Sequence, residues 1–444
     1  MNFNNYFYLW RYGLGKKGAI KSYKNVITNQ VLSNEDLDEL SWTKSKNLVD
    51  FAFNNVPWYH EKFKTIGLHP NDITKPEYFQ QIPILKRYEI IDNFEKFIAN
   101  GITLKDLNFI TTGGSSGTPL KIGVSKHRIR EVQKWQMLDW WNTRMNADMA
   151  SVYRGLPTKG LKKMALHFIN WPQRVIRMDA TQITTQEILT FIQKYKKIQP
   201  KIIRGYVGAI DTIADYILEN KISFSCKPNA IILTAAPVSA IQEYKISKAF
   251  NAPVCDQYGC SEIYFIASEC KQKKGLHVFA DSVKVEIVDE NNKLVNNGEQ
   301  GKIILTNLEE YAFPLIRYEN GDESRLLKEP CTCGLTLPLM DKVKGRTSDN
   351  LTFPNGLVLS GEYLTTIFDN YTANVKQFQI IQKKDLSILV RVKLYTNKDA
   401  NFITKVIENE IGNRINNQVS LKLEFVSEIK QEKGKLKFII KEEN

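Results

Sequence analysis

The chain has 444 residues, 43% of them hydrophobic and 25% charged, and its formal net charge is +13. This composition predicts an ordinary globular protein of about two or three domains and excludes a disordered or fibrous chain. The sequence contains no run of about 18 apolar residues, so it predicts no membrane span. The start lacks the apolar core of a signal peptide, so we expect a cytoplasmic protein.

The positive charge comes from basic residues that are spread along the chain and not gathered in one arm. This pattern is typical of a lysine-rich solvated surface. No helix-turn-helix or RNA-binding signature accompanies it, so we expect no nucleic-acid partner. A basic field favours anionic substrates such as ATP and leaves peripheral association with an anionic surface open.

The N-terminal quarter of the chain predicts a mostly helical segment. Asn34, Glu35 and Asp36 form a polar cap with early acids, which predicts a helix that ends before Pro57. Lys44 interrupts the apolar face of this helix. A further helix is expected within residues 127–146.

Three tryptophans, Trp135, Trp140 and Trp141, lie on that second expected helix. Core packing is the interpretation that their spacing favours. A place for one of them in an acyl pocket is the alternative.

A glycine-rich stretch runs from Thr111 to Pro119, directly after the apolar residues Leu107 to Ile110 that predict a strand. Glycines let backbone N–H groups converge on one point, and hydroxyl side chains add donors. The stretch is not a Walker loop, because no Gly-Lys-Ser/Thr follows at the required spacing. It predicts a polyphosphate cradle, with an ordinary loop as the alternative.

Short strands alternate with helices from about residue 150 to about residue 340, which predicts an α/β sheet. After Gly345 and Arg346 the pattern changes to that of a small α+β unit. We therefore expect a large domain over residues 1–345 and a small mobile domain over residues 346–444. The expected strands cover 202–203, 230–233, 284–288, 301–305, 375–382, 386–393 and 420–426, and the expected helices cover 211–220, 361–368 and 400–412.

Five further segments follow the glycine-rich stretch in a fixed order. They are Ala235-Ala236-Pro237, Asp256 to Glu262, Pro314 to Asp322, Gly345 to Asp349, and Lys433 to Phe438. This succession resembles the adenylate-forming (acyl-CoA synthetase) superfamily. The segments Leu48 to Tyr59 and Ile82 to Lys86 are similar to signatures of its phenylacetate–CoA ligase and CapK-like capsule-biosynthesis branch.

The resemblance implies a role for each segment. The glycine-rich loop would hold the β- and γ-phosphates of ATP, Tyr258 would offer a flat face to adenine, and Asp322 would bind the ribose hydroxyls. Glu262 would hold Mg2+, which proteins usually bind through few carboxylates together with phosphates. Lys435 would place a positive charge between the substrate carboxylate and the α-phosphate, where negative charge builds in the transition state.

The implied nucleotide-binding set also includes Arg346, which would reach the ribose or phosphate from the domain boundary. The full set comprises Thr112, Gly113, Gly114, Ser115, Ser116, Gly117, Thr118, Ala236, Pro237, Gln257, Tyr258, Gly259, Ser261, Asp322 and Arg346.

Structural alternatives stand beside these roles. Tyr258 suits a core aromatic, Asp322 a turn residue and Glu262 a helix cap. Lys433 and Lys437 flank Lys435 and are alternatives for the catalytic charge.

Cys270, His277, Cys331 and Cys333 predict a metal site. Three thiolates and one imidazole satisfy a closed tetrahedral zinc site, and similar residues occur in part of the family that the chain resembles. A structural zinc is therefore expected, with four unrelated residues as the alternative. Cys255 and Cys260 are expected to be small packing residues.

The resemblance implies an enzyme that activates a carboxylic acid with ATP and Mg2+, releases pyrophosphate, and passes the acyl group to coenzyme A, an amine, a sugar precursor or a carrier. Surface polysaccharide biosynthesis is the context that the CapK-like branch implies. A non-catalytic nucleotide-binding or scaffold protein of a polysaccharide-assembly system is the alternative. The sequence identifies neither the acid nor the oligomeric state.

Overall fold

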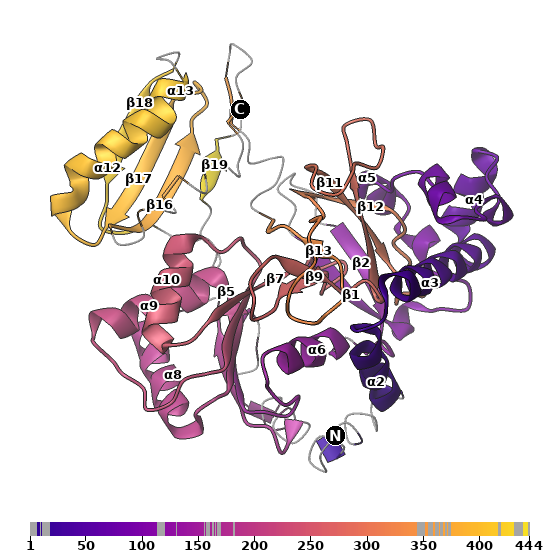
Figure 1. The fold of residues 1–444 in the computed structure, drawn as a ribbon, viewed down its shortest axis with the longest axis horizontal. Helices are drawn as coiled ribbons and strands as arrows, with labels where there is room; N and C mark the ends of the chain where they lie inside the picture. The colour runs from indigo at the N-terminus through magenta and orange to yellow at the C-terminus, as the bar shows by residue number, and fades with distance from the viewer. Residues whose placement is uncertain are drawn as a thin grey trace. The chain divides into compact units, whose positions relative to one another are not determined.

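The computed structural model (Figure 1) groups the chain into two compact units. The first unit joins residues 1–146 to residues 257–342, and the second joins residues 147–256 to residues 343–444. The predicted boundary at residue 346 lies outside the described residues and stays a prediction. The structure describes residues 7–8, 10, 18–112, 120–129, 131–154, 156, 160–161, 164, 166, 170–180, 183–343, 351–353, 358–359, 364, 367–368, 371, 374–415, 419–429 and 438–442.

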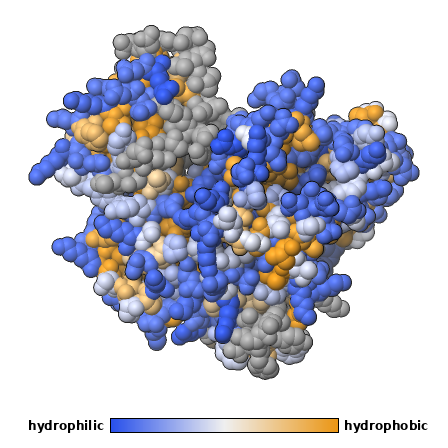
Figure 2. Space-filling model, viewed as in Figure 1, coloured by the Kyte–Doolittle hydropathy of each residue, from blue (hydrophilic) through white to orange (hydrophobic). Residues whose placement is uncertain are grey.

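Hydrophilic residues dominate the face of the molecule seen in Figure 2. Within the part of the chain that the structure describes, no helix combines the length and the apolar character that a membrane span requires.

The first unit opens with the expected helical segment. In α3 (Asn34–Asn55) the Ser33 side chain accepts a hydrogen bond from the Asp36 N–H, which caps the helix start. Lys44 lies where its ammonium donates to the Asp281 carbonyl and pairs with Glu309, which explains the break in the apolar face. The other helices and 3-10 turns here are α2 (Ala19–Asn29), α4 (Pro57–Thr65), η1 (Pro70–Asp72), η2 (Pro76–Gln81), α5 (Arg87–Asp92), η3 (Phe94–Phe97), η4 (Leu104–Asp106) and α6 (Val132–Trp140).

The tryptophans of the second expected helix are buried, as core packing predicts. Trp135 lies in a cluster with Tyr8 and Val26. The Trp140 indole N–H donates to the side chain of Gln30, the residue after α2, so α2 and α6 share one core.

Three antiparallel sheets complete the first unit. A hairpin pairs β1 (Leu107–Thr112) with β2 (Leu120–Ser125). A second sheet has the order β10 (Val283–Val288), β11 (Gly301–Asn307) and β12 (Tyr318–Ser324). In the third, the last residues of β7 (Val254–Tyr258) pair with β8 (Ala267–Glu269). Strand β8 pairs with β9 (Leu276–Val278), which in turn pairs with β13 (Leu339–Met340).

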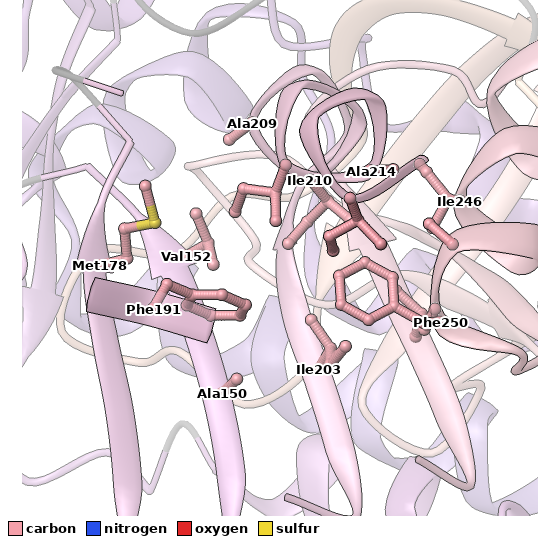
Figure 3. Close-up of a cluster of buried hydrophobic side chains, with 14 of the residues drawn as sticks. Ala150, Val152, Met178, Phe191, Ile203, Ala209, Ile210, Ala214, Ile246 and Phe250 are labelled. Carbon is pink, nitrogen blue, oxygen red and sulfur yellow. The ribbon is translucent and has the colours of Figure 1, made fainter. Parts of the chain in front are cut away.

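The second unit contains the expected α/β sheet. Its strands are parallel and run in the order β4 (Val175–Asp179), β3 (Met149–Tyr153), β5 (Ile202–Tyr206), β6 (Ala230–Thr234) and the first residues of β7. Helices α8 (Thr185–Ile198), α9 (Val207–Glu219) and α10 (Ala240–Phe250) pack on one face of it, where Val152, Ile203 and Phe250 form part of a buried core (Figure 3). The expected helix over residues 211–220 begins four residues earlier, at Val207.

The C-terminal residues form a small α+β unit of the predicted kind. Its four-stranded sheet has the order β18 (Leu421–Phe425), β17 (Ile388–Leu394), β16 (Val375–Gln382) and β19 (Ile439–Lys441). The predicted strands over 375–382, 386–393 and 420–426 are confirmed, and the expected helix over residues 361–368 lies mostly outside the described residues. The remaining elements are β14 (Leu351–Thr352), β15 (Val358–Leu359), η7 (Asn397–Asp399), α12 (Ala400–Ile407), η8 (Glu408–Gly412) and α13 (Asn413–Ile415).

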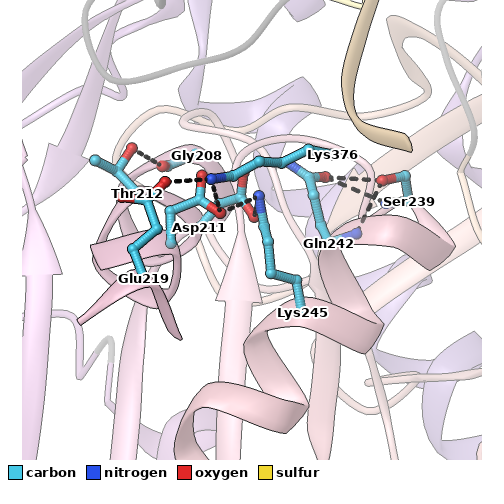
Figure 4. Close-up of polar contacts among 9 residues, drawn as sticks. Gly208, Asp211, Thr212, Glu219, Ser239, Gln242, Lys245 and Lys376 are labelled. Atoms are coloured by element: carbon cyan, nitrogen blue, oxygen red, sulfur yellow. Dashed lines mark hydrogen bonds and ion pairs between the residues drawn. The ribbon is translucent and has the colours of Figure 1, made fainter. Parts of the chain in front are cut away.

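A buried ion cluster joins α9, α10 and β16 of the second unit (Figure 4). The Lys245 ammonium lies 2.8 Å from Asp211 and 3.0 Å from Asp215, and Lys245 and Asp211 are fully buried. Burial by itself lowers the pKa of Lys245, but the two carboxylates outweigh it and raise that pKa above its ordinary value. Lys376 of β16 reaches the same group, 3.5 Å from Asp215 and 2.6 Å from Glu219.

Replacing one partner of this cluster should be costly. Lys245→Met would leave Asp211 buried without its cation, so we expect the free energy of unfolding to fall by about 3–5 kcal/mol in urea denaturation. The matched control is Lys248→Met, at an exposed position of the same helix, which should change that free energy by less than about 0.5 kcal/mol. Equal losses in the two variants would contradict a stabilising role for the buried cluster.

Candidate active site

The glycine-rich stretch lies in the chain between β1 and β2 of the hairpin. Thr112 pairs with Leu120 across the two strands, so the loop leaves and re-enters the hairpin at adjacent positions. Six of the seven predicted phosphate-binding residues, Gly113 to Thr118, lie outside the described residues, as does the side chain of Thr112.

A triangle of hydrogen bonds joins Tyr258, Asn320 and Asp322 in the first unit. The Tyr258 hydroxyl donates to Asp322 Oδ2 over 2.9 Å. The Asn320 amide donates to Tyr258 Oη over 2.7 Å and to Asp322 Oδ2 over 2.8 Å. The predicted adenine and ribose residues are therefore in direct contact, although 64 positions separate them in the chain.

A bulge in β12 presents Asn320 and Asp322. Lys302 pairs with Glu323 and Ile304 pairs with Glu319, so β12 carries extra residues opposite a short piece of β11. Gly321 lies within the bulge at φ +85°, a left-handed conformation that favours glycine.

The turn after β7 presents Glu262. Glu262 is nine-tenths buried, and its Oε1 accepts a hydrogen bond from the Tyr318 hydroxyl over 3.1 Å. The turn is closed by the Tyr264 N–H, which donates to the Cys260 carbonyl, and by the Ile266 N–H, which donates to the Tyr258 carbonyl. Glu262 and Asp322 are thus held by neighbouring parts of the same two segments.

Burial raises the pKa of the Tyr258 hydroxyl well above its ordinary value, and the Asp322 charge raises it further. Burial and then Glu262 likewise raise the pKa of the Cys260 thiol. Both groups are therefore neutral near pH 7, where Tyr258 can act as a hydrogen-bond donor. A neutral thiol agrees with the expected packing role of Cys260.

Arg317 anchors the segment that carries Asp322. It is buried, its Nε donates to Glu286 over 3.2 Å, and its Nη1 donates to the carbonyls of Gln80 and Ile82. The backbones of Leu85 and Arg317 also bond, Leu85 N–H to the Arg317 carbonyl over 2.9 Å. Two signature segments that are far apart in the chain are therefore one structural piece.

The remaining predicted residues are only partly described. Gln257 is buried and its side chain donates to the Tyr258 carbonyl, whereas Ser261 is exposed. Ala236 and Pro237 belong to the second unit, directly after Ala235, which has a φ of +75°. Arg346 and Lys435 lie outside the described residues. Sequence reasoning did not single out Asn320, Tyr318 or Arg317, although all three stand within the quoted segment from Pro314 to Asp322.

The four predicted metal ligands form a single cluster. The ligand atoms of Cys270, His277, Cys331 and Cys333 lie within 4.8 Å of one another. Cys270 and Cys331 are 3.7 Å apart at sulfur, close to the roughly 3.8 Å that two 2.3 Å zinc–sulfur bonds give in a tetrahedron. His277 Nε2 lies 3.3 Å from the Cys333 sulfur.

The surroundings of this cluster also suit a metal. His277 Nδ1 lies 3.2 Å from the Leu337 carbonyl, which fixes the tautomer that turns Nε2 toward the thiols. The Gln272 N–H donates to the Cys270 sulfur over 3.4 Å. Burial raises the pKa of the Cys270 thiol to about 12. The donor set therefore fits zinc, which would replace the thiol protons.

The chain is similar to known proteins in both sequence and structure. Residues 351–442 match the CapK C-terminal domain. The chain is 26% identical to Protein CapK of Staphylococcus aureus, over 90% of this chain and 88% of that protein. It is 25% identical to the phenylacetate-coenzyme A ligase of Thermus thermophilus, over 72% and 73%. A solved 2-hydroxyisobutyryl-CoA ligase, in the postadenylation state with R3-HIB-AMP, matches with a TM-score of 0.77 at 16% identity, over 93% of this chain and 91% of that one.

The fold is that of the adenylate-forming ligases, with the C-terminal domain that the sequence predicts. This confirms the mixed α/β class that the alternation of strands and helices indicated. The sequence similarity to CapK and to the phenylacetate–coenzyme A ligases agrees with the resemblance that the order of the motifs indicated.

A substitution at Gly259 tests the geometry of the turn that holds Glu262. A Cβ added at Gly259 would lie 2.0 Å from the Tyr264 carbonyl oxygen, so Gly259→Ala must move backbone. We expect a loss of about 1–3 kcal/mol of stability and faster hydrogen exchange at the Ile266 N–H.

Gly412→Ala is the control, because its added Cβ would lie at an ordinary 3.5 Å from Leu421. Unchanged exchange at Ile266 in Gly259→Ala would show that the turn is not constrained as described.

Proposed function

We propose that this protein activates a carboxylic acid as an acyl-adenylate and then transfers the acyl group to coenzyme A. A carboxylate oxygen attacks the α-phosphorus of ATP, the bond to the bridging oxygen of the β-phosphate breaks, and pyrophosphate leaves. The thiol then attacks the acyl carbon and AMP leaves. An amine or a carrier in place of coenzyme A remains part of the proposal, as does a role in surface polysaccharide biosynthesis.

The observation that carries this proposal is the contact between Tyr258, Asn320 and Asp322. It places an aromatic face, an amide and a two-oxygen acceptor together, which suits a nucleoside with adjacent hydroxyls. Asp322 would accept from the ribose hydroxyls while Tyr258 and Asn320 fix the orientation of its carboxylate.

Glu262 would hold Mg2+ beside this group. One of its oxygens accepts from Tyr318, and Mg2+ needs few protein carboxylates when phosphates supply further ligands. The ion would neutralise phosphate charge. Tyr318 would then orient the carboxylate.

Pyrophosphate exchange tests the proposal. The full chain, with ATP and Mg2+, should exchange labelled pyrophosphate into ATP only when the right carboxylic acid is present, so aryl acids, amino acids and sugar acids are screened in parallel. Nucleotide binding without exchange for any acid would favour the alternative of a non-catalytic binding protein.

Lys435→Ala should lower exchange by roughly 100-fold or more, because the charge is needed where negative charge builds, and should leave ATP affinity within about threefold. Lys433→Ala and Lys437→Ala are matched controls that remove one charge on either side. Equal loss of exchange and ATP binding in Lys435→Ala would count against this assignment, as would a stronger effect at either neighbour.

We also propose that Cys270, His277, Cys331 and Cys333 hold a structural zinc ion. Metal analysis of the purified chain should find a single zinc per chain, and Cys331→Ser should lose it and unfold at a lower temperature, because bound metal stabilises the folded state. Cys226→Ser, outside the cluster, should keep its zinc and its unfolding temperature. Full zinc content in Cys331→Ser would contradict the proposed ligand set.

A further inference from the structure

One edge of the C-terminal sheet has no partner strand. β18 lies at the end of the strand order and pairs in parallel with β17 on one side (Figure 1). Among the residues that the structure describes, no strand pairs with its other side. An edge strand presents a row of backbone N–H and C=O groups that can serve as a template for a strand of another chain.

The hydrogen bonds to β17 show which backbone groups of β18 face outward. The Ile388 N–H donates to the Ser420 carbonyl over 2.8 Å, and the Val426 N–H donates to the Val392 carbonyl over 2.9 Å. Every second residue of a strand bonds to the same neighbour, because the ladder is evenly spaced. The even-numbered residues therefore bond to β17, and the odd-numbered residues of β18 direct their N–H and C=O groups to the unpaired side.

The two faces of β18 differ in character. Leu421 and Leu423 pack against the buried core of the C-terminal sheet. Phe425 lies on the same face, because strand side chains alternate, and it is 39% exposed. Lys422 and Glu424 lie on the opposite face, where the ammonium is 2.8 Å from the carboxylate. The strand contains neither a proline nor a bulge, two of the devices that protect other edge strands from pairing.

The order of the side chains makes this edge complementary to itself. When two copies of β18 pair antiparallel about Leu423, Lys422 of each copy lies opposite Glu424 of the other. Their backbone groups face β17, so these are non-hydrogen-bonded pairs, at which side chains of facing strands come closest. On the other face Leu421 lies opposite Phe425, which gives the exposed ring an apolar neighbour.

We propose that β18 is a self-association edge, through which two copies of this chain pair antiparallel about Leu423 and join their C-terminal sheets into one continuous sheet. The charges select this register. Moving the centre of pairing by one residue puts Lys422 opposite its own copy in one direction and Glu424 opposite its own copy in the other, and like charges directly opposite are destabilising. The inference does not depend on the proposed acid activation.

Analytical ultracentrifugation of the full chain tests the proposal. The weight-average mass should rise with protein concentration from that of a monomer toward that of a dimer. Lys422→Glu places two like-charge pairs where two opposite-charge pairs stood, so the Kd of the dimer should rise by roughly tenfold or more. Lys384→Glu is the matched control, because it makes the same charge change at an exposed position between β16 and β17 and should leave the Kd unchanged.

Charge reversal at both positions distinguishes this register from a general effect of charge. A chain that carries Lys422→Glu together with Glu424→Lys should dimerise again, because opposite charges face each other once more. The two single variants should associate with each other more tightly than either does with itself. Glu424→Lys also loses the 3.4 Å contact with Arg391, so its unfolding temperature is measured alongside. Lys422→Glu keeps that contact and decides the test by itself where Glu424→Lys unfolds.

Two results would overturn the inference. An unsubstituted chain that stays monomeric at every concentration up to its solubility would reject self-association, and the edge would then suit an extended segment of another protein. A dimer whose Kd is the same in Lys422→Glu and Lys384→Glu would show that another surface holds the two copies together.

Discussion

The hydrogen bond from Tyr258 to Asp322 is the interaction on which the candidate active site depends. It joins the end of β7 to the bulge of β12, and Asn320 closes the group by donating to both. Because the hydroxyl is neutral at ordinary pH, it donates a hydrogen bond to the carboxylate and fixes its direction. The same two segments carry Glu262 and its partner Tyr318, so one piece of structure positions both acids.

Two buried groups of charged residues stabilise the structure, one in the first unit and one in the second. Arg317 connects the segment of Asp322 to backbone carbonyls of the helical lead-in, which joins these two distant segments of the chain. Lys245 with Asp211 and Asp215 connects helices α9 and α10. Buried ions contribute mainly when every partner is present, so each arrangement specifies one packing and penalises others.

Much of this arrangement could be predicted from the sequence. The strands at 375–382 and 420–426 have clear apolar patterns, and the four candidate metal ligands could be grouped from their residue types and from the resemblance. Asn320 could not be singled out, because its role depends on the bulge around Gly321, and a bulge depends on register with β11.

The central claim is that the carboxylate of the substrate becomes bonded to the α-phosphorus of ATP. An acid labelled with oxygen-18 in its reacting carboxylate tests this most directly, followed by mass spectrometry of the nucleotide product after acyl transfer. The account predicts AMP that carries a single labelled oxygen. Unlabelled AMP, or label in ADP, inorganic phosphate or pyrophosphate, would contradict it.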